Sequence, residues 1–315
     1  MIRRADLLDL GLSQRVVENA TASGELVHVR HGCFVLGEIW RASGDGGRHR
    51  LVAAAAARAA RHPLVFSHAT AAALHGLPRI GRWPRTVHVR TTGAAGGSSS
   101  RTSTAHRGGS APEIVTVEGL HATCLARTLI DIATSESFLV AVAMLDHALR
   151  VDQEREQDEL RRLGYARPAL TVAELGAELE RANLRTGVRA ARAALDFASP
   201  LAGSPGESLS RVRMLQLGFE VPELQTCFPN AAGHDRFVDF FWRSVRIIGE
   251  FDGRLKYTRG RVLGDRDPAD VVLDEKLRED ALRPHVSRLL RWDWDRAFSP
   301  TAFHAFLTEH GVPRA

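Results

Sequence analysis

Residues 236–256, RFVDFFWRSVRIIGEFDGRLK, hold the pattern that decides the fold of the C-terminal part of the chain. The segments FVDFFW (237–242) and VRIIGEFD (245–252) have the composition of two strands. Arg243 and Ser244 form a short turn between them. The stretch therefore predicts a β-hairpin, and with it a sheet in this part of the molecule.

Three carboxylates belong to this hairpin. Side chains two residues apart share a strand face, so Glu250 and Asp252 point the same way, and Asp239 on the paired strand can face that side. Crowded carboxylates repel each other unless a cation joins them or one is protonated. Oxygen clusters of this kind hold Mg²⁺, so the pattern predicts a magnesium site with Asp239 and Glu250 as metal ligands. The alternative is a solvated strand end with acids near a turn.

The lysine usage adds to this prediction. Of 42 basic residues only Lys256 and Lys276 are lysines, and both follow the acidic cluster. A lysine beside a metal-bound water can orient it or neutralise developing charge, whereas the alternative is the chance survival of two lysines. Glu207 joins the candidates, although it completes a capping box with Ser204 and this structural role is the favoured one. The candidate catalytic residues are Asp239, Glu250, Asp252, Lys256, Glu207 and Lys276.

The segments around the hairpin follow a helix, three strands, helix, strand, helix order. Ser204-Pro-Gly-Glu207 begins the first helix, Asp267-Pro268 begins the second, SRLLRWDWD (287–295) is the last strand, and Ser299-Pro300 caps the last helix. This order resembles the PD-(D/E)XK nuclease core, with Glu207 on the first helix and Asp239 and Glu250 on neighbouring strands. E-F-D-G-x-x-K, EKLREDALR and LLRWDW resemble more narrowly the branch related to very-short-patch repair endonucleases.

The resemblance implies a Mg²⁺-dependent DNA endonuclease fold over residues 199–315. The sequence departs from the family pattern at Asp252, where (D/E)-x-K has lysine, and at Lys256, where the related branch more often has histidine. Either Lys256 or Lys276 supplies the missing cation, or the site binds DNA or metal without cutting.

Composition sets the limits for the whole chain. Its 315 residues are 44% hydrophobic and 25% charged, which suits a soluble protein of two or three domains. A net charge of +5 and a pI near 9.7 are compatible with nucleic acid. Cys33, Cys124 and Cys227 have the spacing of neither a disulfide framework nor a zinc site. With no signal peptide and no apolar run long enough to cross a bilayer, we expect a cytoplasmic protein without membrane contact.

Residues 1–40 show the order of a winged helix-turn-helix. IRRADLLDLGL is a helix ending at Gly11, Ser13 caps the second helix, and ELVHVRHGCFVLG (25–37) forms a two-stranded wing. The G-L-S, G-E-L and R-H-G-C-F segments resemble the winged helix of AbiEi-type antitoxins, which usually has another helix in front. The alternative is a protein-docking module. The candidate DNA-binding residues are Arg3, Arg4, Gln14, Arg15, Glu18, Arg30 and His31.

The glycine-rich segment 42–47 predicts a break before a mixed α/β middle region over 48–150. In that region TTGAAGGSSSRTSTAH (91–106) has the composition of a mobile loop. S-H-A-T-A-A-x-L-H-G-L and R-T-L-x-D resemble the middle of actinobacterial AbiEi-like proteins, and we interpret the region as a scaffold joining two nucleic-acid modules. Residues 151–198 predict a charged linker and two helices that brace the C-terminal domain.

The predicted architecture is α/β multidomain: a winged helix-turn-helix, a mixed α/β middle region and a PD-(D/E)XK nuclease-like core. Two functions follow. One is a DNA-binding regulator of the AbiEi antitoxin type, which by resemblance represses its own operon and counters a toxin of nucleotidyltransferase type. The other is a Mg²⁺-dependent DNA endonuclease delivered to its target by the winged helix.

Overall fold

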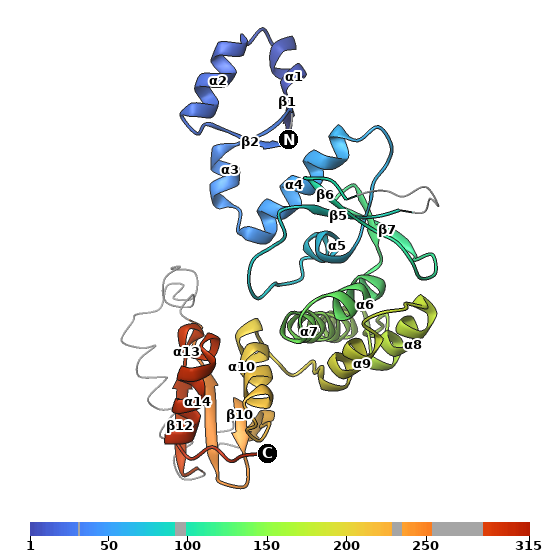
Figure 1. Cartoon of the computed structure of the whole chain (residues 1–315). Helices are drawn as coiled ribbons and strands as arrows, with labels where there is room; N and C mark the ends of the chain where they lie inside the picture. Colours follow the sequence, from blue (N-terminus) through green and yellow to red (C-terminus); the bar gives the residue numbers. More distant parts are fainter. Residues whose placement is uncertain (31, 92–98, 229–234, 254–285) are drawn as a thin grey trace. The chain divides into compact units, whose positions relative to one another are not determined.

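The computed structural model describes residues 1–30, 32–91, 99–228, 235–253 and 286–315 (Figure 1). These residues divide into two compact units: Met1–Ala148 with Pro168–Ala198, and Leu149–Arg167 with Ser199–Ala315. Both units combine helices with a sheet, so the predicted α/β multidomain class is confirmed. Among the described residues no helix is both long and apolar enough to cross a membrane.

The N-terminal part of the first unit has a β-α-α-β-β order. Its elements are β1 (Ile2–Arg3), α1 (Arg4–Asp9), α2 (Gln14–Ala22), β2 (Leu26–Arg30) and β3 (Cys33–Leu36). The strands form one antiparallel sheet in the order β1-β3-β2. Leu7, Val17, Leu26 and Phe34 pack beneath the helices as a small core. The two predicted helices and the hairpin after them are confirmed, and their winged-helix identity stays a prediction.

The predicted break at 42–47 is shorter in the structure. The helix α3 (Gly37–Ala42) follows β3 directly, and α4 (Asp45–Ala59) already contains Gly46 and Gly47. Gly46 lies against the indole of Trp83, where a Cβ atom would be 3.4 Å from the ring. Packing against Trp83 therefore extends the helix through residues whose intrinsic preference is against it.

A five-stranded mixed sheet forms the centre of the first unit, in the order β6-β5-β4-β8-β7. Its strands are β4 (Val65–Phe66), β5 (Val87–Arg90), β6 (Ser103–His106), β7 (Ile114–Val117) and β8 (Leu120–Thr123). The pairs β4–β8 and β5–β6 are parallel. The expected loop over 91–106 thus contains an edge strand, which forms because Ser103–His106 pairs with β5 despite a composition poor in strand formers.

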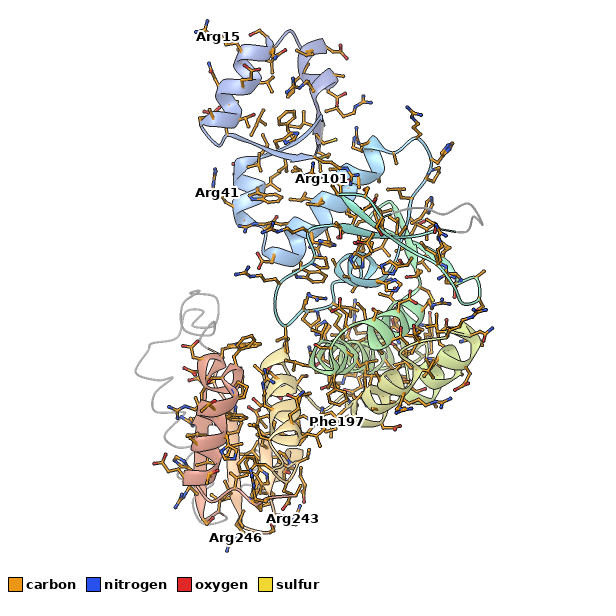
Figure 2. The ribbon with its side chains drawn as sticks, in the orientation of Figure 1. Arg15, Arg41, Arg101, Phe197, Arg243 and Arg246 are labelled. Carbon is orange, nitrogen blue, oxygen red and sulfur yellow. The ribbon has the colours of Figure 1, made fainter. Side chains whose placement is uncertain are left out.

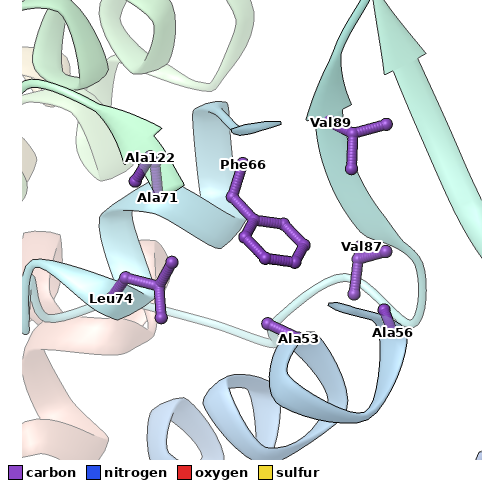
Figure 3. Packing of buried hydrophobic residues seen from close by; sticks show 8 residues of the cluster. All are labelled: Ala53, Ala56, Phe66, Ala71, Leu74, Val87, Val89 and Ala122. Carbon is purple, nitrogen blue, oxygen red and sulfur yellow. The ribbon is translucent and has the colours of Figure 1, made fainter. Parts of the chain in front are cut away.

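The helices α4 and α5 (His68–Leu74) pack on one face of this sheet. Figure 3 shows the contact, in which small alanines let the helices approach closely. The residues of this cluster are Ala53, Ala56, Phe66, Ala71, Leu74, Val87, Val89 and Ala122. Ser13 stands at the predicted N-cap position of α2, and Ser67 is the N-cap residue of α5, but neither side chain makes a capping hydrogen bond.

The helices that complete the first unit are α6 (Leu125–Ser135), α8 (Val172–Ala182) and α9 (Val188–Phe197). Thr171 caps α8, since its side chain accepts a hydrogen bond from the Glu174 amide. We expected α8 and α9 to brace the C-terminal domain, but they pack on α6 within the first unit. The charged residues from 151 onward continue the helix α7 (Phe138–Leu163).

The second unit contains a four-stranded sheet in the order β12-β11-β10-β9. Its strands are β9 (Glu223–Phe228), β10 (Arg236–Trp242), β11 (Ile247–Phe251) and β12 (Arg288–Trp292). Its helices are α10 (Pro205–Gln216), α13 (Trp294–Phe298), which we did not expect, and α14 (Pro300–Glu309). The hairpin is confirmed, with a turn of four residues, 243–246.

The predicted N-caps of α10 and α14 are confirmed. The Ser204 side chain accepts a hydrogen bond from the Glu207 amide, and the Ser299 side chain accepts one from Ala302. The helix expected after Asp267-Pro268 lies outside the described residues. The order of the described elements agrees with the predicted order, and the nuclease identity of this unit stays a prediction.

Candidate nucleic-acid interface and carboxylate site

The second helix of the N-terminal part presents a polar face to solvent. Gln14, Arg15 and Glu18 are exposed, whereas Val17 on the opposite side is buried in the core. The Gln14 amide donates to Glu18 Oε1 at 2.8 Å, so these two side chains are held together along the helix. Figure 2 shows Arg15 at the start of α2, extending away from the rest of the chain. This face can therefore approach a groove or a phosphate.

The other predicted phosphate contacts are in different environments. Arg3 forms an ion pair with Asp6 at 2.7 Å, and its hydrogen bonds hold the pKa of the Asp6 carboxyl below its usual value. The Arg4 guanidinium lies over the Phe34 ring, 5.9 Å from its centre. Arg30 is half-buried and donates to Thr102 Oγ1 at 2.8 Å, so it links the hairpin to the start of β6. His31 lies outside the described residues.

Sequence reasoning missed a basic stretch next to this part of the chain. Residues 46–112 contain ten arginines and no Asp, Glu or Lys, so they carry a formal charge of +10 in a chain whose total is +5. All other residues of the chain together carry a formal charge of −5, so the whole-chain value hides the local excess of positive charge. The ten are Arg48, Arg50, Arg58, Arg61, Arg79, Arg82, Arg85, Arg90, Arg101 and Arg107.

Five of these arginines are exposed, and within the described part of the chain their guanidinium groups make no hydrogen bond or ion pair. They are Arg58, Arg61, Arg82, Arg85 and Arg101. Arg101 is next to Thr102, which Arg30 contacts, and Figure 2 labels it. Arg79 has a structural role instead, because it makes two 2.9 Å hydrogen bonds to Glu136. The signal for this surface was the absence of acidic residues.

The two middle segments singled out in the sequence meet in space. His68 Nδ1, from S-H-A-T, lies 3.7 Å from Asp131 Oδ2, from R-T-L-x-D. Arg127 Nε donates to Asp131 Oδ1 at 2.9 Å, and both side chains are buried. Burial raises the pKa of Asp131 above its usual value. His68 and Asp131 are 63 residues apart in the sequence, so only the tertiary structure brings them together.

Three histidines extend this cluster across the sheet. The rings of His68 and His106 stack with centroids 3.5 Å apart, and His106 Nε2 lies 3.1 Å from His88 Nδ1. Burial, with smaller contributions from neighbouring charges, lowers the pKa of His68 to about 2 and that of His88 and His106 to about 4. All three are therefore neutral at pH 7.

The hairpin of the second unit brings two of the predicted carboxylates together. Phe240 pairs with Gly249, and continuing this register sets Asp239 opposite Glu250. The Asp239 carboxylate accepts a 2.9 Å hydrogen bond from the Phe251 amide. Asp252 lies beyond the end of β11 and is exposed, so strand alternation does not extend to it.

Arg291, on the parallel neighbour β12, was not among the predicted site residues. Its Nε lies 3.4 Å from Glu250 Oε2, and Glu250 is 7% exposed. The strand pairing of Glu250 with Arg291 explains this contact. A cation on the neighbouring strand therefore faces the carboxylate pair, a role the sequence had suggested for Lys256 or Lys276.

Glu207, at the start of α10, is a further predicted catalytic residue. Glu207 Oε1 and Oε2 accept hydrogen bonds from Ser204 Oγ at 2.8 Å and from the Gly203 amide at 2.7 Å, so its carboxylate is engaged at the start of α10. Lys256 and Lys276 lie outside the described residues. Within the ranges that the structure describes, no three His, Cys, Asp or Glu side chains are grouped in a way that could hold a metal ion.

Comparison with known proteins connects the middle of the chain with one family. Residues 64–181 match the model of the AbiEi antitoxin C-terminal domain. Two uncharacterized proteins, from two strains of Mycobacterium tuberculosis, are each 30% identical to the chain over 159 residues. Each match covers 50% of this chain and 50% of the relative, so the chain spans about half the length of the curated relatives it matches. No solved structure matches the chain significantly.

Proposed function

We propose that this protein is a DNA-binding regulator of the AbiEi antitoxin type, acting in the cytoplasm. The observation that carries the proposal is the exposed polar face of α2 with Arg15 at its start, in a β-α-α-β-β unit that precedes the antitoxin-domain match. In this proposal α2 enters the major groove, where Gln14 and Glu18 face base edges and Arg15 faces a phosphate.

The basic stretch 46–112 supports the same proposal. Affinity for DNA comes largely from neutralised phosphates, and five exposed arginines there make no ion pair among the described residues. Arg30, bonded to Thr102, connects the hairpin to this stretch. We infer that the DNA-binding surface extends from α2 over the first unit and is not confined to residues 1–40.

The direct test is a titration of the full chain against duplex DNA. Fluorescence anisotropy with the DNA upstream of its own gene, and with a shuffled duplex of equal length, measures affinity and specificity across salt concentrations. We expect tighter binding to the upstream DNA and a linear loss of log affinity with log salt. Absence of binding to both duplexes at low salt would contradict the proposal.

The antitoxin type also implies a toxin partner, and the resemblance suggests a nucleotidyltransferase. The match to the antitoxin domain over 64–181 supports this partner. Co-expression with the product of an adjacent gene tests it: the gene product alone should arrest growth, and this chain should restore growth. Arrest that the chain does not relieve would contradict the antitoxin proposal while leaving DNA binding intact.

A second candidate is a Mg²⁺-dependent DNA endonuclease, supported by the register that sets Asp239 opposite Glu250. In this candidate Asp239 and Glu250 would hold the ion, which would supply an activated water, and Lys256 or Lys276 would assist at the scissile phosphate. Cleavage of plasmid and linear DNA with and without Mg²⁺ is the test. Cleavage that needs Mg²⁺ and disappears in Asp239→Asn would favour this candidate.

A further inference from the structure

A cavity of about 420 Å³ lies between the strand ends of the five-stranded sheet and the loop that joins β6 to β7. Val65, Ala111, Pro112 and Ile114 supply apolar walls, and Arg90 is the charged residue among those that line it in the described structure. Cavities of this size suit small molecules, which bind by apolar contact and a few placed polar groups.

Arg90, which lines the cavity, and the buried Arg127 both contact the loop that borders it. Arg90 Nη2 donates to the Gly108 carbonyl at 2.8 Å and to the Ser110 carbonyl at 2.9 Å. Arg127 Nη1 donates to the same Ser110 carbonyl at 3.2 Å. Two guanidinium groups therefore share one neutral acceptor, which cannot balance their charge.

Positive charge exceeds negative charge around this point. Arg127 is fully buried, and its Nη2 has no hydrogen-bond partner among the described residues. A Cβ atom on Gly109 would first meet the Ala182 carbonyl and the Leu184 side chain, and that nitrogen would follow at 3.1 Å. Asp131 forms an ion pair with Arg127. Glu178 lies 3.9 Å from Arg127 but only 2.9 Å from Arg181. Asp131 Oδ2 is likewise buried without a hydrogen-bond partner among the described residues, so the unpartnered atoms of this pair carry both signs. The positive charge of Arg90, which has no carboxylate bonded to it in the described structure, is what favours an anion in the cavity.

The groups beside Arg90 also suit an anion. His106 is the strand partner of Arg90 and stays neutral at pH 7, because burial and its neighbours lower its pKa to about 4. A neutral imidazole can donate one N–H without adding repulsion toward Arg90. The Arg90 guanidinium can bind a carboxylate or a phosphate by donating two parallel hydrogen bonds to its oxygens.

We propose that this cavity is a binding site for a small organic anion. Its carboxylate or phosphate group is held by Arg90, the buried Arg127 adds positive charge behind the Ser110 carbonyl, and its apolar part packs on Val65, Pro112 and Ile114. The site lies within the 64–181 match, and nothing in the DNA-binding proposal requires it.

Isothermal titration of the full-length protein tests the site with four probes. Benzoate and phenyl phosphate carry the two head groups on one ring, inorganic phosphate lacks the apolar part, and benzyl alcohol lacks the charge. We expect saturable 1:1 binding of benzoate or phenyl phosphate, at least ~10-fold tighter than that of benzyl alcohol. The tighter-binding of these two probes shows whether the natural ligand carries a carboxylate or a phosphate.

Three variants localise the binding. Ala111→Trp fills the cavity from an exposed position and keeps both arginines, and Arg90→Gln removes the charge. Arg82→Gln, an exposed arginine outside the cavity lining, is the matched control. Because Arg90 also holds the loop, the melting temperature of each variant is measured, and Ala111→Trp decides the result if Arg90→Gln is unstable.

We expect Ala111→Trp and Arg90→Gln to weaken anion binding at least ~10-fold and Arg82→Gln to leave it unchanged. The proposal is overturned if none of the anions shows saturable binding at concentrations up to ~10 mM, because a dissociation constant above that value is too weak for a preformed site. Equal binding of benzyl alcohol, or undiminished binding in Ala111→Trp, would also overturn it.

Discussion

Arg15 and Arg30 have the same charge but different surroundings. Arg15 is exposed at the start of α2, whereas Arg30 is half-buried and bonded to Thr102. An exposed guanidinium can replace a phosphate counterion, but a bonded one must first give up its partner. Replacing Arg15 therefore changes DNA affinity alone, whereas replacing Arg30 also removes a contact inside the first unit.

Arg15→Ala should weaken binding to all duplexes alike and lower the slope of log affinity against log salt by about one unit. The melting temperature should stay unchanged, because the side chain touches nothing in the core. Anisotropy across salt concentrations measures the slope. Arg243→Ala, which removes a surface arginine paired with Glu223 in the second unit, is the control and should leave the slope unaltered.

The neutral histidine cluster predicts how stability depends on pH. The folded-state pKa of His88 and His106 is lowered to about 4 from the ordinary value of 6.5, so below pH 6.5 the unfolded chain binds protons that the folded chain does not. Their contribution is complete above pH 6.5 and is lost as pH falls toward 4. Asp131, whose pKa is raised, contributes with the opposite sign.

Thermal melts between pH 7 and pH 4 should therefore show a falling melting temperature for the first unit. His106→Gln should make this fall shallower, since one of the groups that binds a proton only on unfolding is gone. His62→Gln changes an exposed histidine and serves as the control. An identical fall in wild type and His106→Gln would contradict the assignment to the cluster.

At the scale of single elements, short local patterns set where several helices begin. Thr171 and Glu174 satisfy each other's backbone amides at the start of α8. The Ser204 and Ser299 side chains accept from the Glu207 and Ala302 amides at the starts of α10 and α14. Each contact lies within three residues of the chain, so it is readable from sequence.

Thr171→Ala should destabilise the first unit by about 1 kcal/mol, because the cap of α8 is lost where α8 packs on α6. Thr171→Ser keeps an accepting oxygen and should retain most of that stability. Urea unfolding followed by a probe in the first unit measures the difference, since two units need not unfold together. Equal stability of the alanine and serine variants would show that the cap contributes nothing.

At the scale of the whole molecule, charge is distributed unevenly along the chain. The +10 of residues 46–112 contrasts with −5 for all the rest. The first unit therefore holds the surface suited to DNA, and the second unit holds the carboxylate pair. Separate measurements on DNA binding and on metal binding in the full chain can test the two units independently.

The metal prediction for the second unit is a thermal one. If Asp239 and Glu250 hold an ion, wild type should have a higher melting temperature in Mg²⁺ or Mn²⁺ than in chelator. At an ion concentration 100 times the dissociation constant, the ion should add about 2.7 kcal/mol to the free energy of unfolding. Asp239→Asn should abolish this shift without unfolding the sheet, because an amide oxygen can still accept from Phe251. Asp252→Asn is the exposed control. No divalent-ion shift and no cleavage in wild type would contradict the nuclease candidate.

The amino-acid sequence alone determined the order of most elements, the hairpin over 236–256 and the capped starts of α8, α10 and α14. Hydrophobic alternation and capping depend on residues a few positions apart, so these features need no knowledge of distant packing. The match over 64–181 agrees with the resemblance drawn from S-H-A-T and R-T-L-x-D.

Only the tertiary structure decided the rest. The strand β6 exists because β5 lies beside it, and α4 runs through Gly46 because Trp83 packs there. The contact of His68 with Asp131 and that of Glu250 with Arg291 each join segments far apart in the sequence. Such pairings depend on which surfaces the collapsed chain buries together, and local propensity carries no information about that choice.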